Sequence, residues 1–229
     1  MELKIKDIVT LLNVSEKTVY KWIKENKIPC YKINHQYRFN RPEINEWLLS
    51  NKVTGVSTSA LNINNNPNTD SFARILERGG IISSIKGQNV REVFKNAIDR
   101  IFIPPDLSKD ELFEALISRE EMMPTAIGHG IAIPHPRTPV ITVADNTSVS
   151  ICYLEAPFDF GALDGQEVHT IFILLTDSPR RHLDVLSKIS FLCQDDVFLD
   201  MLKNQSEKEQ ILEYVREKEV DWTKKENKV

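Results

Sequence analysis

Residues 168–175 read VHTIFILL, a near-continuous apolar run that is rich in β-branched side chains. A run of this length and composition is typical of a strand that is buried on both faces. Upstream, residues 147–155 carry large apolar side chains at every second position, which predicts a strand with two unlike faces. Helical patterns flank both runs. Residues 71–229 are therefore predicted to form an α/β (α+β) domain, an α/β sandwich around a mixed β-sheet.

Capping residues mark the starts of two helices in this region. Ser108 opens a capping box and begins a helix that is expected to end near Met122. Ser178, followed by Pro179, predicts a second helix whose first turn contains His182. The amide groups at such a helix start favour a bound phosphoryl group.

Two histidines are candidates for chemistry. His135 lies between Pro134 and Pro136, so its backbone is rigid and its imidazole is presented from a fixed position. A neutral imidazole is a nucleophile near pH 7 and needs no metal to accept a phosphoryl group. On the residues alone, a purely structural or surface role for His135 and His182 stays open. The five histidines are dispersed and no cysteine lies near His135, so neither a metal site nor a cofactor is expected.

A change of composition divides the chain. Residues 53–70, VTGVSTSALNINNNPNTD, are rich in Asn, Ser and Thr and predict a flexible linker. Residues 1–60 carry 10 Lys and Arg against 6 Asp and Glu, whereas the remainder carries 19 against 27. A basic module on an acidic body is expected, and small basic modules often bind nucleic acid. The predicted domains are residues 1–52 and 71–229.

Composition also excludes some classes of protein. No apolar run approaches the roughly 18–20 residues that a membrane-spanning helix needs, so no membrane insertion is expected. The opening MELKIKDIVTLL has charges where a signal peptide has its apolar region. Three scattered cysteines make no disulfide framework. These features predict a cytoplasmic protein.

The first domain has the pattern of two short helices and a hairpin. Apolar residues at helical spacing predict a helix over residues 5–12, and Ser15 is placed to cap a second helix. Residues 30–39 then predict a two-stranded hairpin with Asn34-His35 at its tip, and Pro42 opens a third helix. Two helices joined by a short turn form a helix-turn-helix, whose second helix enters the major groove.

Residues 5–48 resemble the excisionase-type winged helix-turn-helix, a relative of the MerR DNA-binding domain. The matching pieces are NVSEKTVYKWIKENKIP, YKINHQYRF and the closing helix with Trp47. The candidate DNA contacts are Lys17, Thr18, Lys21, Lys32 and Arg38. The cations among them can neutralise phosphates, which positions a protein without reading sequence. One such domain offers little interface, so useful specificity is expected to need a homodimer or tandem binding. A helical protein-interaction module is the alternative.

Residues 71 to about 215 are similar to phosphotransferase-system enzyme IIA domains of the fructose/mannitol/nitrogen-regulatory type. The matching pieces are SREEMMPTAIGHGIAIPH, PFDFGALDGQEV and RRHLDVLSKIS. The resemblance implies that His135 receives a phosphoryl group from an HPr- or NPr-type phosphocarrier, with Arg119 and His182 in the same site. The approach loop departs from the family pattern at Met123-Pro124 and Ala126.

Two functions follow from these resemblances. One is a regulator in which an enzyme IIA domain is coupled to DNA binding and transcription. The other is the IIA component of a sugar transport system, which passes phosphate to a separate enzyme IIB while the small domain docks a partner. The quoted sequence has no IIB or IIC segment, which favours the regulator.

Overall fold

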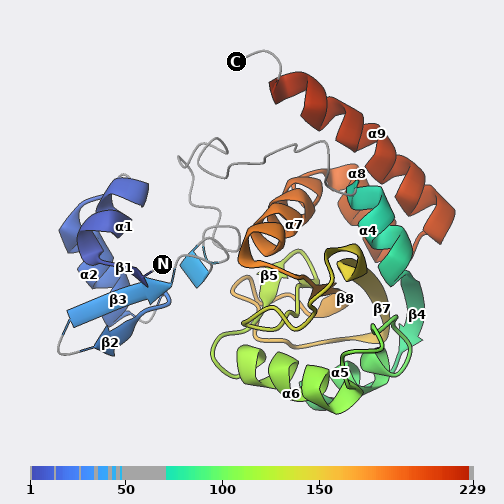
Figure 1. The fold of residues 1–229 in the computed structure, drawn as a ribbon, viewed down its shortest axis with the longest axis horizontal. Coiled ribbons are helices and arrows are strands. Elements are labelled where there is room, and N and C mark those ends of the chain that lie inside the picture. The colour runs from blue at the N-terminus through green and yellow to red at the C-terminus, as the bar shows by residue number, and fades with distance from the viewer. Residues whose placement is uncertain are drawn as a thin grey trace. The chain divides into compact units, whose positions relative to one another are not determined.

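The computed structural model of the 229-residue chain describes residues 2–12, 14–25, 27–33, 36–40, 43–44, 47 and 71–226. The chain divides into two compact units, Met1–Ile63 and Asn64–Val229 (Figure 1). The linker predicted over residues 53–70 lies outside the described residues, and so does the hairpin tip Asn34-His35. The domain boundaries derived from the sequence therefore stay a prediction.

The first unit contains the predicted helices and hairpin. Its elements are β1 (Glu2–Leu3), α1 (Ile5–Leu12), α2 (Glu16–Lys24), β2 (Tyr31–Ile33) and β3 (Gln36–Asn40). Strand β1 was not expected, because two residues carry no periodic signal. It pairs antiparallel with β3, and the three strands form a sheet in the order β1-β3-β2.

A small apolar core holds this unit together. Ile8, Val19, Phe39 and Ile44 are fully buried and pack in one cluster with Trp47, whose indole N–H donates to the Lys27 carbonyl. Ser15 caps α2 as predicted, since its hydroxyl accepts from the backbone N–H of Thr18 at 3.1 Å. Of the predicted third helix, Pro42 and Leu48 lie outside the described residues, whereas Ile44 and Trp47 are buried.

The second unit is the larger one, and it contains both helices and strands. They are α4 (Phe72–Gly79), β4 (Ile81–Ile85), α5 (Val90–Ile98), α6 (Lys109–Glu120), β5 (Ala126–Gly128), β6 (Ile131–Ala132), η2 (Ala144–Asn146), β7 (Ser148–Phe158), β8 (Val168–Leu175), α7 (Pro179–Leu192), α8 (Asp196–Lys203) and α9 (Lys208–Glu226). Helix α6 ends at Glu120, two residues earlier than expected from the sequence.

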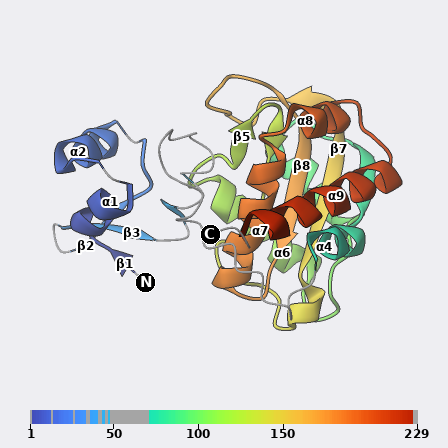
Figure 2. The ribbon, with the colours of Figure 1, turned by 90° about the horizontal axis from the view of Figure 1, so that it is seen from above.

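The strands of the second unit form the predicted mixed sheet, in the order β4-β7-β8-β6-β5. Strand β7 pairs antiparallel with β8 and parallel with β4, while β6 pairs parallel with β8 and antiparallel with β5. Helices α5 and α6 cover one face, and α4, α7, α8 and α9 cover the other (Figures 1 and 2). Strand β8 is central, which explains its continuous apolar run. Among the described residues, no helix combines the length and apolar character that crossing a bilayer requires.

Two close contacts tie α4 to the rest of the unit. A side chain at Gly79 would place its Cβ 2.1 Å from the Val149 carbonyl oxygen, so the helix approaches β7 at a distance that only glycine permits. Ser150 lies on the small-residue face of β7, which is buried. Its hydroxyl donates to the Gly79 carbonyl at 2.9 Å, so this face of β7 contacts the end of α4. At the other end of α4, the Glu219 carboxylate of α9 accepts from the backbone N–H groups of Phe72 and Ala73.

Candidate functional site

The structure brings Arg119, His135 and His182 together, although they come from three separate segments. Arg119 lies in the last turn of α6, His135 follows β6, and His182 lies in the first turn of α7. The Arg119 Nε donates to His135 Nε2 at 3.2 Å, and the two imidazole rings have their centroids 4.7 Å apart. Each of the three side chains is at most 8% exposed. Buried polar groups of this kind need hydrogen-bond partners.

The hydrogen bonds of His135 define its tautomer. Its Nδ1 lies 2.7 Å from the carbonyl oxygen of Ile133. A carbonyl oxygen only accepts, so Nδ1 carries the proton and donates it. The neutral ring then has its lone pair on Nε2, the nitrogen that faces Arg119. The backbone next to His135 is also fixed, because Leu174 of β8 donates to the Pro134 carbonyl at 3.1 Å.

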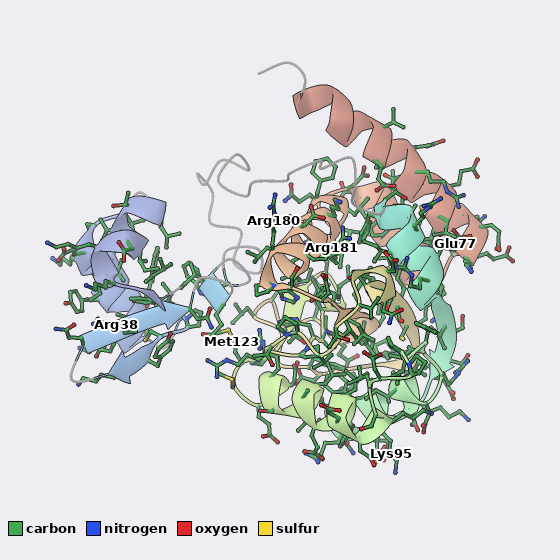
Figure 3. The ribbon with its side chains drawn as sticks, in the orientation of Figure 1. Arg38, Glu77, Lys95, Met123, Arg180 and Arg181 are labelled. Atoms are coloured by element: carbon green, nitrogen blue, oxygen red, sulfur yellow. The ribbon has the colours of Figure 1, made fainter. Side chains whose placement is uncertain are left out.

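The position of His182 follows from the start of α7. Ser178 caps this helix as predicted, with its hydroxyl accepting from the Arg181 N–H at 3.3 Å. The His182 Nδ1 faces the Thr176 hydroxyl, which follows β8, at 3.5 Å. Of the neighbouring cations, Arg180 is exposed and Arg181 is half-buried (Figure 3).

The turn after α6 holds Arg119 in place. The Arg119 Nη1 donates to the Met123 carbonyl at 2.7 Å, so the contact uses the backbone of the residue at which the sequence departs from the family pattern. The Glu120 carboxylate accepts from both the backbone N–H and the hydroxyl of Thr125, at 2.9 and 2.6 Å. Burial raises the pKa of the Glu120 carboxyl, while the bonds from Thr125 and the charge of Arg119 act in the opposite direction. The sequence analysis did not identify Glu120 as a site residue. The only indication in the sequence was that Glu120 directly follows Arg119.

The described part of the chain contains no group of three or more His, Cys, Asp or Glu side chains that could hold a metal ion. What the site offers instead is an unprotonated ring nitrogen beside a guanidinium, with a second imidazole close by. This arrangement can accept a phosphoryl group and neutralise its charge.

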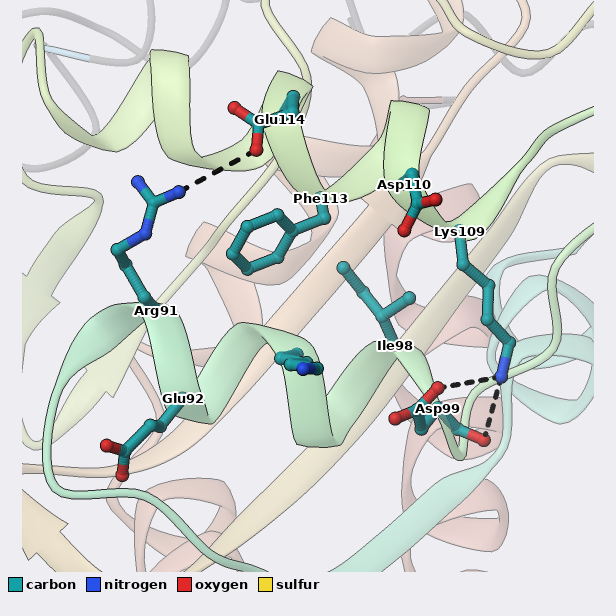
Figure 4. Close-up of a pocket in the computed structure, with 9 residues that line it drawn as sticks. Arg91, Glu92, Ile98, Asp99, Lys109, Asp110, Phe113 and Glu114 are labelled. Carbon is teal, nitrogen blue, oxygen red and sulfur yellow. Dashed lines mark hydrogen bonds and ion pairs between the residues drawn. The ribbon is translucent and has the colours of Figure 1, made fainter.

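A surface hollow of about 480 Å³ lies between α5 and α6 (Figure 4). The Arg91 Nη2 is 3.6 Å from Glu114 and the Lys109 Nζ is 2.9 Å from Asp99, so charges along its rim pair with one another. The residues that line it are Arg91, Glu92, Lys95, Ile98, Asp99, Lys109, Asp110, Phe113 and Glu114. The hollow is therefore separate from the histidine site.

In the first unit, α2 presents one exposed stripe. Lys17, Tyr20, Lys21 and Lys24 are exposed and recur at helical spacing, while Val19 and Ile23 on the other side are buried. The Thr18 hydroxyl is within 2.8 Å of the Ser15 hydroxyl, which places Thr18 in the cap of the helix.

The register of the hairpin separates two of the predicted DNA contacts. Lys32 lies directly opposite Tyr37 and Arg38 lies opposite Tyr31, so Lys32 and Arg38 belong to different faces. The Lys32 Nζ lies 5.8 Å from the Tyr37 ring centroid, and Tyr37 meets Tyr20 edge-on at 6.2 Å. The Lys32 face is thus continuous with the stripe on α2. Arg38 instead donates to Gln36 Oε1 at 2.7 Å.

The aromatic pair was missed by sequence reasoning. Tyr20 is 49% exposed, and its ring joins the exposed stripe of α2 to the hairpin through Tyr37. Its position one turn from Lys17 and Lys24 was the signal that could have indicated it.

Comparisons with known proteins agree with this geometry. The family described as "Phosphoenolpyruvate-dependent sugar phosphotransferase system, EIIA 2" matches residues 74–218, and a "Helix-turn-helix domain" matches residues 2–52. A nitrogen regulatory protein of Pseudomonas aeruginosa is 30% identical over 147 residues, which make up 62% of this chain and 92% of that protein. The mannitol-specific phosphotransferase enzyme IIA component of Geobacillus stearothermophilus is 26% identical over 143 residues, 62% of this chain and 96% of that protein.

Among solved structures, the nitrogen regulatory protein IIA-Ntr of Neisseria meningitidis superposes with a TM-score of 0.54. It is 28% identical, and the match covers 62% of this chain and 97% of that one. The chain thus belongs to the EIIA 2 family of the phosphoenolpyruvate-dependent sugar phosphotransferase system, and it carries a helix-turn-helix domain in residues 2–52.

Proposed function

We propose that His135 accepts a phosphoryl group from an HPr- or NPr-type phosphocarrier. The observation that carries this proposal is the 2.7 Å contact between His135 Nδ1 and the Ile133 carbonyl oxygen, because a proton on Nδ1 leaves the lone pair on Nε2. Nε2 is therefore the attacking atom. Arg119, whose Nε lies 3.2 Å away, supplies positive charge at the same point.

The reaction exchanges one nitrogen–phosphorus bond for another. His135 Nε2 gives its electron pair to phosphorus while the bond in the donor phosphohistidine breaks, and the donor imidazole leaves with that electron pair. The Nδ1 of His135 keeps its proton, so the ring becomes positively charged and the Ile133 carbonyl stabilises it. Such a transfer asks the protein mainly for in-line positioning and charge stabilisation.

Arg119 and His182 bind the phosphoryl oxygens in this scheme. The guanidinium moves from Nε2 to the equatorial oxygens while its Nη1 stays anchored on the Met123 carbonyl. Because Ile133 already sets the tautomer of His135, the function left for His182 is a hydrogen bond to the phosphoryl group.

The test is transfer of labelled phosphate from a phosphorylated phosphocarrier to the full chain. The wild type is expected to become labelled, with an acid-labile bond and a ³¹P–¹⁵N coupling to Nε2 of His135. His135→Gln should take up no label. His129→Asn is the matched control, since Asn tolerates the left-handed backbone of residue 129. Full labelling of His135→Gln contradicts the proposal.

The second part of the proposal is that residues 1–52 bind DNA. The observation that supports it is the continuous surface of Lys17, Tyr20, Lys21 and Lys32 across α2 and the hairpin. Helix α2 would enter the major groove, with the lysines against phosphates and Thr18 at the start of the helix. Arg38, on the opposite face of the hairpin, would reach only a phosphate on that side.

Binding of the full chain to a genomic DNA pool tests this part. DNA affinity falls as the salt concentration rises, and each phosphate contact that is lost should reduce the steepness of log affinity against log salt concentration by about one. Lys17→Ala and Lys21→Ala should each do so, whereas Lys95→Ala on α5 should not (Figure 3). If the full chain binds no DNA from the pool even at low salt, DNA binding is contradicted.

Together these parts describe a cytoplasmic regulator that couples phosphorylation to transcription, as a homodimer or by tandem binding. The second candidate is an enzyme IIA that passes phosphate to a separate enzyme IIB. It draws on the likeness to the mannitol-specific relative, while the regulator draws on the helix-turn-helix match. Transfer from labelled protein to a fructose- or mannitol-type IIB, with no DNA binding, would favour transport.

A further inference from the structure

Glu120, the last residue of α6, joins that helix to the segment that presents His135. Its two carboxylate oxygens accept from the backbone N–H and the hydroxyl of one residue, Thr125, at 2.9 and 2.6 Å. Thr125 is 5% exposed and lies immediately before β5. The carboxylate therefore closes the turn formed by residues 121–124.

The connection continues through the backbone to the histidine. The Thr125 carbonyl accepts from the Ile133 N–H at 3.0 Å, and the Ile133 carbonyl accepts from Nδ1 of His135 at 2.7 Å. Each bond has only one direction, because amides donate and carbonyls accept. The series thus links the Glu120 carboxylate to the carbonyl that accepts from Nδ1 of His135.

Arg119 reaches the same ring from the other side. It donates to His135 Nε2 at 3.2 Å, and its Nη1 is anchored on Met123 inside the turn that Glu120 closes. Two consecutive residues of α6 therefore hold both ring nitrogens, one directly and one through Thr125 and Ile133. Loosening the turn would disturb both contacts at once.

We infer that Glu120 is a positioning residue of the acceptor site, which fixes His135 in the tautomer with its lone pair on Nε2 through Thr125 and Ile133. This inference rests on the proposed function for its kinetic consequence. The tautomer itself can be measured without any donor.

The experiment compares Glu120→Ala with Glu120→Gln in the full chain. Glutamine keeps both contacts, since its amide oxygen accepts from the Thr125 N–H and its amide N–H donates to the Thr125 hydroxyl. Alanine keeps neither. Glu121→Ala is the matched control, because that neighbouring carboxylate is exposed and lies 3.7 Å from Arg91.

Two readouts are expected to separate the variants. In ¹⁵N spectra of the imidazole nitrogens, Glu120→Ala should show a mixture of His135 tautomers, whereas Glu120→Gln and Glu121→Ala should keep the proton on Nδ1. Acceptance from a phosphorylated phosphocarrier should slow roughly 10- to 100-fold in Glu120→Ala and recover in Glu120→Gln.

The inference is overturned if Glu120→Ala keeps a single Nδ1–H tautomer and the wild-type rate, or if Glu120→Gln is as slow as Glu120→Ala. Should Glu120→Ala fail to fold, Thr125→Val takes its place. Thr125→Val removes only the hydroxyl that donates to Glu120, and it should also slow phosphoryl acceptance by His135. A wild-type tautomer and a wild-type rate in Thr125→Val would therefore also overturn the inference. A wild type that takes no phosphate on His135 refutes the proposed function instead, and the tautomer result still decides the role of Glu120.

Discussion

Replacing Arg119 by alanine tests how much of the transfer depends on one buried cation. Arg119 is 8% exposed and donates to His135 Nε2 and to the Met123 carbonyl. Removing one preorganised donor from a site where charge develops costs about 2.7–4 kcal/mol, a factor of roughly 10²–10³ in rate. The lost bond to the Met123 carbonyl should reduce the free energy of unfolding by about 1–3 kcal/mol. We therefore expect a folded protein that accepts phosphate about 100- to 1,000-fold more slowly.

The assay is a single-turnover quench experiment with labelled phosphocarrier, together with thermal unfolding of each variant. Arg119→Lys should be intermediate, because one ammonium keeps the charge but does not span His135 and Met123 as the guanidinium does. Arg216→Ala is the control, since that exposed arginine lies 3.8 Å from Glu77 at the surface. Transfer by Arg119→Ala at the wild-type rate would falsify the catalytic role, and loss of folding in both Arg119 variants would indicate a structural one.

Four further outcomes are expected. His182→Ala should remain folded, as calorimetry would show, and should accept the phosphoryl group about 10- to 100-fold more slowly in quench kinetics, because one charge-assisted bond to that group is lost. Tyr20→Ala should weaken DNA binding in a titration more than Tyr20→Phe does, because the ring joins α2 to the hairpin. Gly79→Ala should lower stability by about 1–3 kcal/mol in chemical unfolding, since a Cβ would meet the Val149 carbonyl oxygen at 2.1 Å. Phosphorylation of His135 should reduce DNA affinity only a few-fold at physiological salt. The added negative charge would compete with DNA for the exposed lysines of α2, and attraction to such exposed charges contributes about 1 kcal/mol or less. Equal affinities of the phosphorylated and unphosphorylated forms would mean that the two domains act independently.

Much of the fold was predictable because local patterns coincide with burial. The run VHTIFILL became β8 with the same bounds, since a central strand needs apolar side chains on both faces. Ser108 and Ser178 cap their helices because a hydroxyl at that position satisfies an amide with no partner inside the helix. The convergence of His135 with Arg119 followed from the family resemblance, and spacing alone did not predict it.

What escaped prediction depends on contacts between distant or opposed residues. The assignment of Lys32 and Arg38 to different faces of the hairpin requires its register, which the sequence of the strands leaves open. The bond that the Thr125 hydroxyl donates to the Glu120 carboxylate depends on the path of the turn between them. The proton on Nδ1 of His135 depends on the nearby Ile133 carbonyl, which no pattern of residue types reveals.

The carboxylate of Glu219 has a consequence for the order in which the chain folds during synthesis. Ser71 caps α4 locally, but the amides of Phe72 and Ala73 donate to Glu219, so these two amides find this partner only after residue 219 has been translated. The unit formed by residues 1–63 has no such requirement among its described contacts. At roughly 5–20 residues per second, the interval between residues 63 and 219 lasts about 8–30 s. On each ribosome, the described contacts of the helix-turn-helix can therefore form well before the contact between α9 and α4.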